Sequence, residues 1–225
     1  MTVYLDFNVS SNQGEGESPP EEMATISRIL GFSGLGFADF SQTQTGNYQK
    51  IKEKLSNLPL KAYSRVNLNF DSVTKNNKIL NRMRKSVDII AVACLNRRIA
   101  VWAARNTDVD LLYFPEIKMY KQVDKSLVGL IYGSENAVEI SIRPILLTKG
   151  LTRANTLGIL RKTAETIQKE RTALVLTSDA HNKFELRSPR GLAALGTLLE
   201  IPYEKAIEAV SKSPLKILER RSNSN

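Results

Sequence analysis

The sequence predicts an α/β protein in which about seven mostly parallel strands are ringed by helices. Short apolar runs alternate with amphipathic helical patterns along the 225-residue chain. Most of the apolar runs, such as VDIIAVAC and ALVLT, are continuous, which is typical of parallel strands covered on both faces. Seven strand–helix repeats within about 180 residues favour a closed barrel over the alternative, an open doubly wound sheet.

Each predicted strand is an apolar run bounded by polar or turn-forming residues. In chain order the strands are Val3–Val9, Gly34–Phe40, Leu60–Phe70, Val87–Cys94, Val109–Phe114, Ala137–Ile142 and Ala173–Thr177. Because parallel strands need long crossover connections, the segments between them should be helical.

The helical patterns lie between these strands. They are Pro20–Leu30, Tyr48–Leu58, Val73–Lys85, Arg97–Arg105, Lys125–Tyr132 and Arg153–Arg171. In the last of these, the sequence LGILRKTAETI places apolar residues at helical spacing on one face. Two further helices are predicted because Ser188-Pro189 and Ser213-Pro214 each supply an N-cap acceptor followed by a proline.

Composition predicts a single folded domain over residues 1–225, because 42% of the residues are hydrophobic and 24% are charged. Low order is expected only in the polar loop Ser10–Pro20 and in a tail of residues 221–225. Cys94 is the single cysteine, which excludes an internal disulfide and a thiolate zinc cage. Apolar runs are too short to cross a bilayer and the first residues lack a signal pattern, so we expect a cytoplasmic protein without a membrane partner.

Positive charge is concentrated in one quarter of the chain. There are 32 Lys and Arg residues against 23 Asp and Glu, a formal net charge of +9. Residues 50–105 hold 13 basic side chains against 3 acidic ones, whereas the rest of the chain holds 19 against 20. This excess favours a polyanionic partner, because lysine and arginine neutralise phosphates and release counterions. The alternative is a solvated face.

The outer helices of a barrel form a continuous skin, so basic residues on neighbouring helices should make one surface that follows a phosphate backbone. The residues expected on this surface are Lys50, Lys52, Lys54, Arg82, Arg84, Arg97, Arg98 and Arg105. Few aromatic residues accompany them, and Trp102 has the spacing of a core residue. Recognition of a folded RNA by shape and phosphates therefore fits better than stacking on single-stranded bases.

The sequence supplies little catalytic chemistry at the C-terminal ends of the strands, where barrel enzymes place their sites. Asp6, Asp179 and His181 are expected there, but His181 is the only histidine and Cys94 lies inside an apolar run. Zinc or iron therefore lacks its usual ligands. The residues leave two interpretations open. One is a Mg²⁺ site at Asp6 and Asp179, and the other is a turn capped by Asp179 with His181 as a polar rim residue or an RNA contact. Neither GxGxxG nor GxxxxGKS occurs, so no nucleotide cofactor is expected.

The segment Phe184–Arg221, FELRSPRGLAALGTLLEIPYEKAIEAVSKSPLKILERR, resembles the C-terminal signature of the ribonuclease P protein component 3 family of archaea and eukaryotes. The segment Ala137–Lys162 also matches, with Arg143, Arg153 and Arg161 where that family has arginines. The early sequence VYLDFNV is similar too. The resemblance covers nearly the whole chain and is looser between residues 65 and 110.

The resemblance implies a seven-stranded TIM-barrel-like fold of the PHP superfamily of metal-dependent phosphoesterases. Those enzymes carry a His-x-His pair on the first strand and a later Ser-Asp-Ala-His. This chain has Asp6-x-Asn8 in the first place and keeps SDAH at Ser178–His181. With two ligands replaced, we expect neither a catalytic residue nor a bound metal or other cofactor. A PHP-like metal-dependent phosphoesterase is the alternative function.

The resemblance also implies a role in ribonuclease P, an endoribonuclease whose catalytic RNA uses Mg²⁺ to remove the 5′ leader from precursor tRNA. Family members pair with the component 2 protein, often as a heterotetramer, and bind the ribonuclease P RNA. The residues expected to contact RNA are Arg65, Arg82, Arg84, Arg97, Arg98, Arg105, Arg143, Arg153, Arg161, Arg187, Arg190 and His181.

Overall fold

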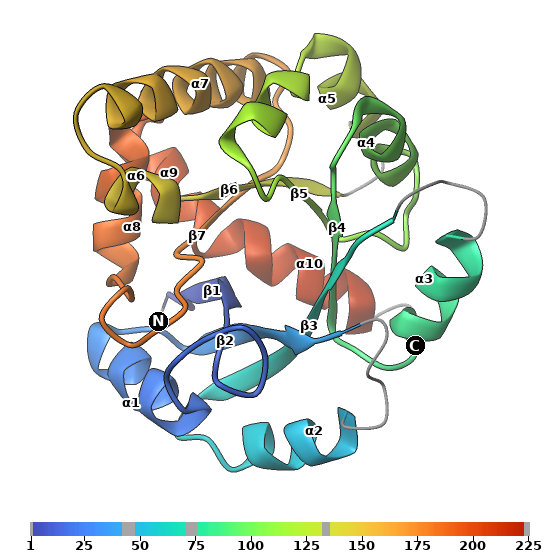
Figure 1. Ribbon diagram of the computed structural model, residues 1–225, viewed down its shortest axis with the longest axis vertical. Helices are drawn as coiled ribbons and strands as arrows, with labels where there is room; N and C mark the ends of the chain where they lie inside the picture. Colours follow the sequence, from blue (N-terminus) through green and yellow to red (C-terminus); the bar gives the residue numbers. More distant parts are fainter. Residues whose placement is uncertain (1, 42–47, 71–75, 132–135, 223–225) are drawn as a thin grey trace.

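The structure, a computed structural model, describes residues 2–41, 48–70, 76–131 and 136–222. Within them, seven parallel strands form one sheet in the order β1-β2-β3-β4-β5-β6-β7. The strands are β1 (Leu5–Val9), β2 (Gly34–Phe40), β3 (Lys61–Leu68), β4 (Ile89–Ala93), β5 (Leu111–Tyr113), β6 (Ala137–Ser141) and β7 (Leu174–Thr177). Helices surround the sheet, which curls into a nearly closed barrel (Figure 1). The predicted fold class is confirmed.

The barrel closes between β1 and β7, where strand pairing is reduced to one parallel bridge between Val9 and Ala180. A side chain supplies one of the links that backbone hydrogen bonds between β1 and β7 would otherwise make. The carboxylate of Asp6 on β1 accepts a hydrogen bond from the backbone N–H of Ser178 at 3.1 Å. The backbone N–H of Ser10 donates to the carbonyl of Ala180 at 2.9 Å. Asp6 therefore helps to close the barrel by linking β1 to the end of β7.

The predicted helices lie within a few residues of their expected positions; residues 73–75 and 132, at the ends of two of them, lie outside the described part of the chain. Ten α-helices are described. They are α1 (Pro20–Leu30), α2 (Tyr48–Ser56), α3 (Asn76–Arg84), α4 (Arg97–Ala104), α5 (Lys125–Ile131), α6 (Arg143–Leu147), α7 (Gly150–Lys169), α8 (Pro189–Thr197), α9 (Tyr203–Ala209) and α10 (Lys212–Ser222). Ser188 caps α8 as predicted, accepting from Gly191 N–H at 3.1 Å. The predicted cap at Ser213 is wrong, because α10 already begins at Lys212.

Three short elements were not predicted: α6, α9 and the 3₁₀ helix η2 (Ile117–Gln122). None is long enough to show two full turns of apolar periodicity, which is the signal that distinguishes a helix from a loop in sequence. None of the described helices combines the length and apolar character that a bilayer crossing needs.

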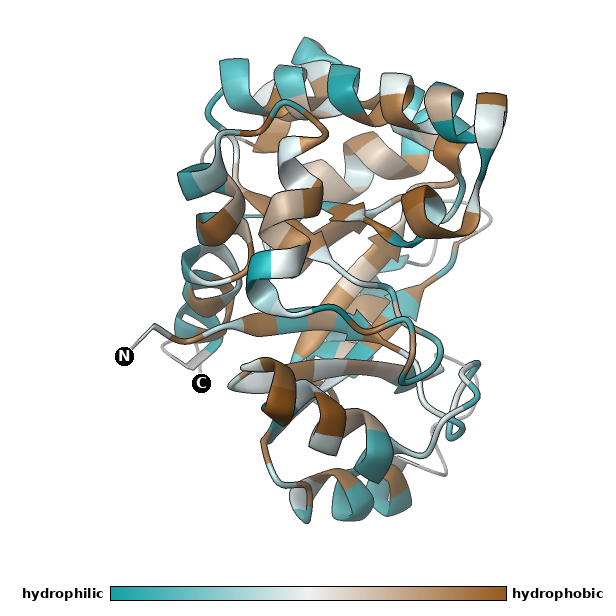
Figure 2. Ribbon diagram, turned by 90° about the vertical axis from the view of Figure 1, so that its left-hand side faces the viewer, coloured by the Kyte–Doolittle hydropathy of each residue, from teal (hydrophilic) through white to brown (hydrophobic). Residues whose placement is uncertain are grey.

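Two apolar cores lie on the two sides of the sheet. The larger core fills the space between the strands and the helices, and Cys94 is buried there as predicted. Figure 2 shows hydrophobic strands surrounded by helices along which hydrophobic and hydrophilic residues alternate. This pattern is expected of helices that pack one apolar face on a barrel.

The smaller core fills the interior of the barrel, and α10 closes one end of it. Ile217 of α10 packs with Leu5, Ile89 and Leu111, which are the first residues of their strands. The helix therefore covers the N-terminal ends of the strands. The expectation of a disordered tail from residue 221 is wrong for Arg221, which lies within α10 and donates a hydrogen bond to Asp110 at 2.6 Å. Residues 223–225 lie outside the described part of the chain.

The β1–α1 connection was predicted to be poorly ordered, and this prediction is wrong. Asp39 at the end of β2 accepts from the backbone N–H of Ser11 at 2.7 Å and from its hydroxyl at 2.6 Å. The backbone N–H of Glu17 donates to the carbonyl of His181 at 2.7 Å. These polar contacts, rather than apolar packing, fix the loop over the C-terminal ends of the strands.

Candidate functional site

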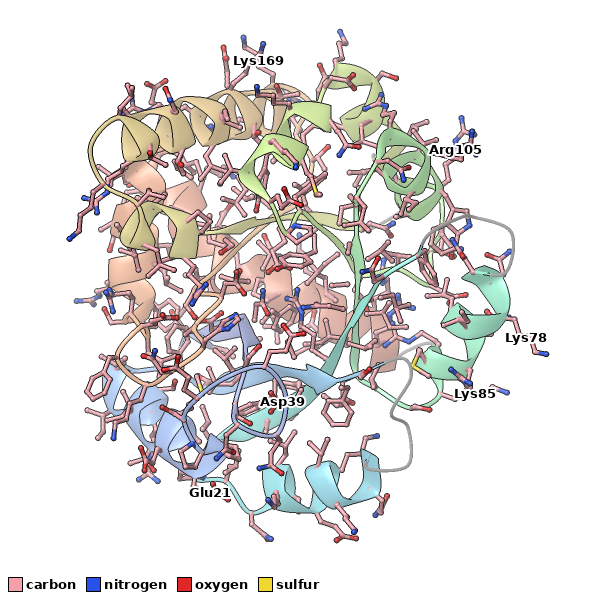
Figure 3. The ribbon with its side chains drawn as sticks, in the orientation of Figure 1. Glu21, Asp39, Lys78, Lys85, Arg105 and Lys169 are labelled. Carbon is pink, nitrogen blue, oxygen red and sulfur yellow. The ribbon has the colours of Figure 1, made fainter. Side chains whose placement is uncertain are left out.

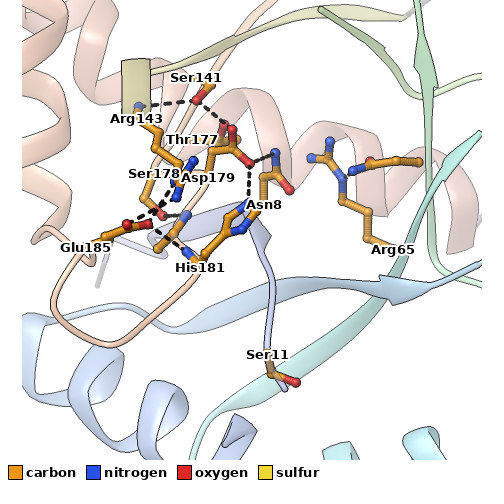
Figure 4. Close-up of polar contacts among 12 residues, drawn as sticks. Asn8, Ser11, Arg65, Ser141, Arg143, Thr177, Ser178, Asp179, His181 and Glu185 are labelled. Carbon is orange, nitrogen blue, oxygen red and sulfur yellow. Dashed lines mark hydrogen bonds and ion pairs between the residues drawn. The ribbon is translucent and has the colours of Figure 1, made fainter. Parts of the chain in front are cut away.

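The C-terminal ends of the strands form the barrel mouth, which contains a network of polar side chains (Figure 4). The amide Nδ2 of Asn8 donates to Glu139 Oε1 and to Asp179 Oδ1, both at 3.0 Å. Thr177 donates to Glu139 at 2.8 Å and Ser141 donates to Asp179 at 3.1 Å. Residues from β1, β6 and the end of β7 are thus tied together where barrel enzymes place their catalytic groups.

Arg65 lies inside the barrel and completes this network. Its guanidinium donates to Glu139 Oε2 at 2.7 Å and to the carbonyl of Phe7 at 2.9 Å, and it lies over the ring of Tyr113. The side chains of Arg65 and Glu139 are both 0% exposed. The prediction that Arg65 contacts RNA is therefore wrong, because the fold leaves none of its atoms accessible. The sequence placed Arg65 on a strand but did not show whether its side chain points into the barrel or toward the outer helices.

Two carboxyl groups at the mouth have raised pKa values. Burial raises the pKa of Asp179 to about 7, with a further contribution from the nearby charge of Glu139. Burial likewise raises the pKa of Asp6 to about 6, although hydrogen bonds from Ser178 oppose the rise. Burial lowers the pKa of His181, whose Nε2 lies 3.9 Å from Asp179.

The geometry of the mouth does not fit the predicted alternative of a metal site. The guanidinium of Arg65 and the amide of Asn8 direct N–H groups at the carboxylates of Glu139 and Asp179, whose lone pairs a metal would need. Asp6 instead accepts from the backbone of Ser178. Among the described residues, no group of three or more His, Cys, Asp or Glu side chains could hold a metal ion.

Most of the other predicted residues from Arg143 onward bind backbone carbonyls or an acidic side chain of the chain itself. Arg143 forms an ion pair with Glu185 at 2.9 Å, and this carboxylate also accepts from the backbone N–H of His181. Arg153 donates to the carbonyl of Thr148 at 2.6 Å. The carbonyls of Phe184 and Leu186 accept from Arg187, and the carbonyl of Leu198 accepts from Arg161. Only Arg161 and Arg190 of this group are exposed to solvent.

The raised pKa of Asp179 leads to a prediction for stability. Between about pH 4 and pH 7 the folded state holds a proton on Asp179 that the unfolded chain has already lost. Raising the pH through this interval should therefore lower the free energy of unfolding. We expect a loss of about 1–2 kcal/mol between pH 5.5 and pH 7.5 from this group, measured by urea denaturation.

The control for this prediction is Asp179→Asn, which keeps the shape of the side chain and the acceptor for Asn8 but cannot titrate. Its stability should change less with pH than that of the wild type over the same interval. Glu185 and Glu208 do not obscure the comparison, since their lowered pKa values move their titration to more acidic pH. Parallel pH profiles for wild type and variant would contradict the prediction.

A basic face lies on the outside of the barrel over α3 and α4. It consists of the exposed side chains of Lys78, Arg82, Lys85, Arg98 and Arg105. Figure 3 places Lys78, Lys85 and Arg105 on the same side of the molecule. The two helices are linked by a hydrogen bond from Asn106 to Asn77. Of the residues predicted for the basic surface, Arg82, Arg98 and Arg105 therefore lie on this face, together with Lys78 and Lys85, which were not predicted for it.

Two arginines expected on that surface are engaged elsewhere. Arg84 turns inward to Asp110, at 2.6 Å, and also donates to the carbonyls of Val87 and Asp88. The prediction that Arg84 belongs to the RNA surface is therefore wrong in its placement, since its side chain is only 17% exposed. Arg97 is half-exposed and pairs with Asp124 at 2.9 Å.

The remaining predicted positions divide between surface and core. Lys50 and Lys54 of α2 are exposed, and Lys54 donates to Gln13 in the β1–α1 loop. Trp102 packs edge-on against Phe70, with ring centroids 5.4 Å apart, in agreement with its predicted place in the core.

Sequence reasoning missed Glu139, the acceptor on which the interior network depends. A signal was present, because a single glutamate stands in the otherwise apolar strand AVEIS and a buried carboxylate requires a charged or hydrogen-bonding partner. The identity of that partner was not readable, since Arg65 lies 74 residues away in the sequence.

The comparison with protein families gives a match to the RNase P subunit p30 family over residues 3–225. The chain is 27% identical over 219 residues to ribonuclease P protein component 3 of Methanosarcina acetivorans, covering 96% of this chain and 88% of that protein. It is also 27% identical over 190 residues to the protein of the same name from Methanocaldococcus jannaschii, covering 83% and 82%.

Among solved structures, the chain resembles one from a cryo-EM structure of archaeal ribonuclease P with mature tRNA. The TM-score is 0.77 at 24% identity, covering 96% of this chain and 91% of that one. A Xaa-Pro dipeptidase shares the fold at a TM-score of 0.58 and 9% identity, covering 98% and 76%. These likenesses establish the barrel. The family match extends over nearly all of the sequence, and the chain belongs to the RNase P subunit p30 family.

Proposed function

We propose that this chain is an RNA-binding protein subunit of ribonuclease P and supports the removal of the 5′ leader from precursor tRNA. The observation that carries this proposal is the family match over residues 3–225. The net charge of +9 and the basic face on α3 and α4 agree with it, because a protein that binds structured RNA gains most of its affinity from phosphates.

In this proposal the catalytic RNA and its Mg²⁺ perform the cleavage, and the protein supplies charge neutralisation and supports the RNA fold. The barrel mouth agrees with a role outside the chemistry. Its buried carboxylates already accept hydrogen bonds from Arg65 and Asn8, and the pKa of His181 is lowered by burial. The chain alone, supplied with Mn²⁺, should therefore not hydrolyse a phosphodiester.

The partners in this proposal are the ribonuclease P RNA, precursor tRNA and the component 2 protein, with which the chain would assemble as a heterotetramer in the cytoplasm. Component 2 would need an apolar contact area on the outer helices. Ile29 at the end of α1 and Leu151 at the start of α7 are 75% and 77% exposed, so they are available for such a contact.

The experiment is reconstitution of cleavage from ribonuclease P RNA, component 2 and this chain at limiting Mg²⁺. Addition of this chain should raise the rate of precursor tRNA cleavage. A rate that does not respond, or cleavage of the leader by the chain without RNA, would overturn the proposed function.

The basic face gives a prediction for RNA affinity. Replacing Arg82, Lys85, Arg98 and Arg105 with glutamine should reduce the slope of log K against log salt by about 2.8–3.6, because each phosphate contact contributes a slope of about 0.7–0.9. Filter binding to the ribonuclease P RNA over a range of salt concentrations measures the slope.

A matched control removes four exposed charges from elsewhere on the molecule, namely Arg28, Lys205, Lys212 and Lys216. The control variant should keep the wild-type slope to within about 1 unit, since general electrostatic attraction is weaker than direct phosphate contact. Equal slopes for the two variants would show that the RNA lies on another face.

A further inference from the structure

A groove of 1030 Å³ lies between α7 and the segment that joins η2 to α5. Lysines line both of its walls. Lys121 and Lys125 come from η2 and the start of α5, and Lys162 and Lys169 come from α7. All four side chains are exposed. We call this feature the lysine groove, and it lies outside the quarter of the sequence that holds the charge excess.

The acidic residues of the lysine groove already have cationic partners. Asp124 pairs with Arg97 at 2.9 Å, and Glu170 pairs with Lys125 at 3.7 Å. Within the described part of the chain, no carboxylate lies within ion-pair distance of Lys121 or Lys162. The groove therefore presents ammonium groups whose charge the protein does not neutralise by direct contact, one on each wall.

The wall formed by α7 also lacks bulky side chains at its centre, so a ligand could approach the helix backbone closely there. Gly158 lies in the middle of this 20-residue helix, where glycine is less favourable than alanine by about 1 kcal/mol. Beyond its own stretch of helix backbone, a Cβ added at Gly158 would meet no atom within 4 Å, so internal packing does not require the glycine. Ala154, one helical turn earlier, is also small and exposed. Something outside the chain that approaches the helix backbone would explain the absence of side chains here.

The lysine groove continues from the basic face. Arg97, next to Arg98 on α4, donates to the carbonyl of Gln122 at the end of η2 and pairs with Asp124, so the helix that carries part of the basic face is tied to one wall of the groove. Figure 1 shows α4 beside α5 and α5 beside the end of α7, and η2 packs against α7. A strand of RNA lying on the basic face could therefore extend into the groove.

We propose that the lysine groove binds the sugar–phosphate backbone of an RNA strand. Phosphates would contact Lys121 and Lys162 from the two walls, while the strand packs over Gly158. The charge of the walls favours RNA over a protein helix, because lysine is a compact point charge suited to phosphate. This inference rests on the proposed function, since it assumes that the chain binds RNA.

The test compares the double variant Lys121→Gln/Lys162→Gln with the wild type in binding to the ribonuclease P RNA. The slope of log K against log salt should fall by about 1.4–1.8, the value for two lost phosphate contacts. Lys205→Gln/Lys216→Gln on α9 and α10 removes the same charge from side chains outside the groove and should leave the slope close to wild type.

A second pair of variants tests the open wall without changing charge. Gly158→Leu fills the groove and should weaken RNA binding several-fold, whereas Gly158→Ala adds one methyl group and should bind nearly as well as wild type. Neither should unfold at a lower temperature, because both residues favour a helix over glycine.

The outcomes separate this inference from the proposed function. If wild type activates cleavage but neither the slope nor the Gly158→Leu affinity changes, the inference fails and the function stands. Loss of assembly with component 2 at an unchanged salt slope would also overturn it and assign the groove to a protein partner. If wild type neither binds the RNA nor activates it, the proposed function itself fails.

Discussion

Replacing Arg65 with methionine should lower the free energy of unfolding by about 3–5 kcal/mol, the effect of leaving a buried charge without its partner. Glu139 would lose its cation while remaining 0% exposed in the barrel. The carbonyl of Phe7 and the side chain of Asn67 would lose hydrogen-bond donors as well. For a chain of this size the melting temperature should fall by roughly 10 °C. Urea denaturation and differential scanning calorimetry measure the change.

The control is the double variant Arg65→Met/Glu139→Gln, which removes both charges and keeps an acceptor for Asn8 and Thr177. It should be more stable than Arg65→Met, because no unpaired charge stays buried. If Arg65→Met does not fold, a folded double variant still supports the prediction. A single variant as stable as wild type, or a double variant no better than the single, would contradict it.

The seven parallel strands and the barrel could be predicted because parallel strands covered on both faces leave continuous apolar runs in the sequence. Runs such as VDIIAVAC and ALVLT contain β4 and β7. The ordered conformation of the β1–α1 loop could not be predicted from such a pattern. Its order comes from Asp39 and from the backbone of His181, which lie far from it in the sequence, and polar contacts of this kind leave no periodic signal.

In the candidate site, too, some features could be predicted from the sequence and others depended on tertiary contacts. The charge excess correctly indicated a basic face on α3 and α4, because composition reports where charged side chains are available. It could not separate Arg82, which is exposed, from Arg84, two residues later on the same helix, which turns to Asp110. The pairing depends on which carboxylate the fold brings to each guanidinium, and that is decided by tertiary structure.

Arg65 and Arg84 also explain why the basic residues of this chain serve two purposes. Arg65 neutralises Glu139 at the mouth, and Arg84, Arg220 and Arg221 surround Asp110 near the opposite end of the barrel. A buried carboxylate is costly unless hydrogen bonds or cations compensate for its lost hydration, and at Glu139 and Asp110 arginines supply both. Part of the positive charge therefore stabilises the fold, and only the exposed remainder is available to RNA.

Replacing Asp110 with asparagine should detach α10 from the barrel and lower the free energy of unfolding by about 3–5 kcal/mol. Asp110 is 0% exposed and accepts hydrogen bonds from Arg84 at 2.6 Å, from Arg220 at 2.8 Å and from Arg221 at 2.6 Å. The variant would leave three guanidinium groups close together without their shared anion. Hydrogen exchange of the α10 amides should increase more than that of β2 or β3, since α10 closes the N-terminal ends of the strands.

The matched control is Asp108→Asn, which removes a neighbouring carboxylate that faces the same Arg221 at 3.8 Å but is 45% exposed. Its effect should stay below about 1 kcal/mol, as for other solvent-exposed ion pairs. Arg220→Met offers a milder variant that leaves Asp110 with two arginine partners, and its stability should lie between the control and Asp110→Asn. Equal urea midpoints for Asp108→Asn and Asp110→Asn would show that burial of this carboxylate does not hold α10 in place, and that the apolar packing of Ile217 is sufficient.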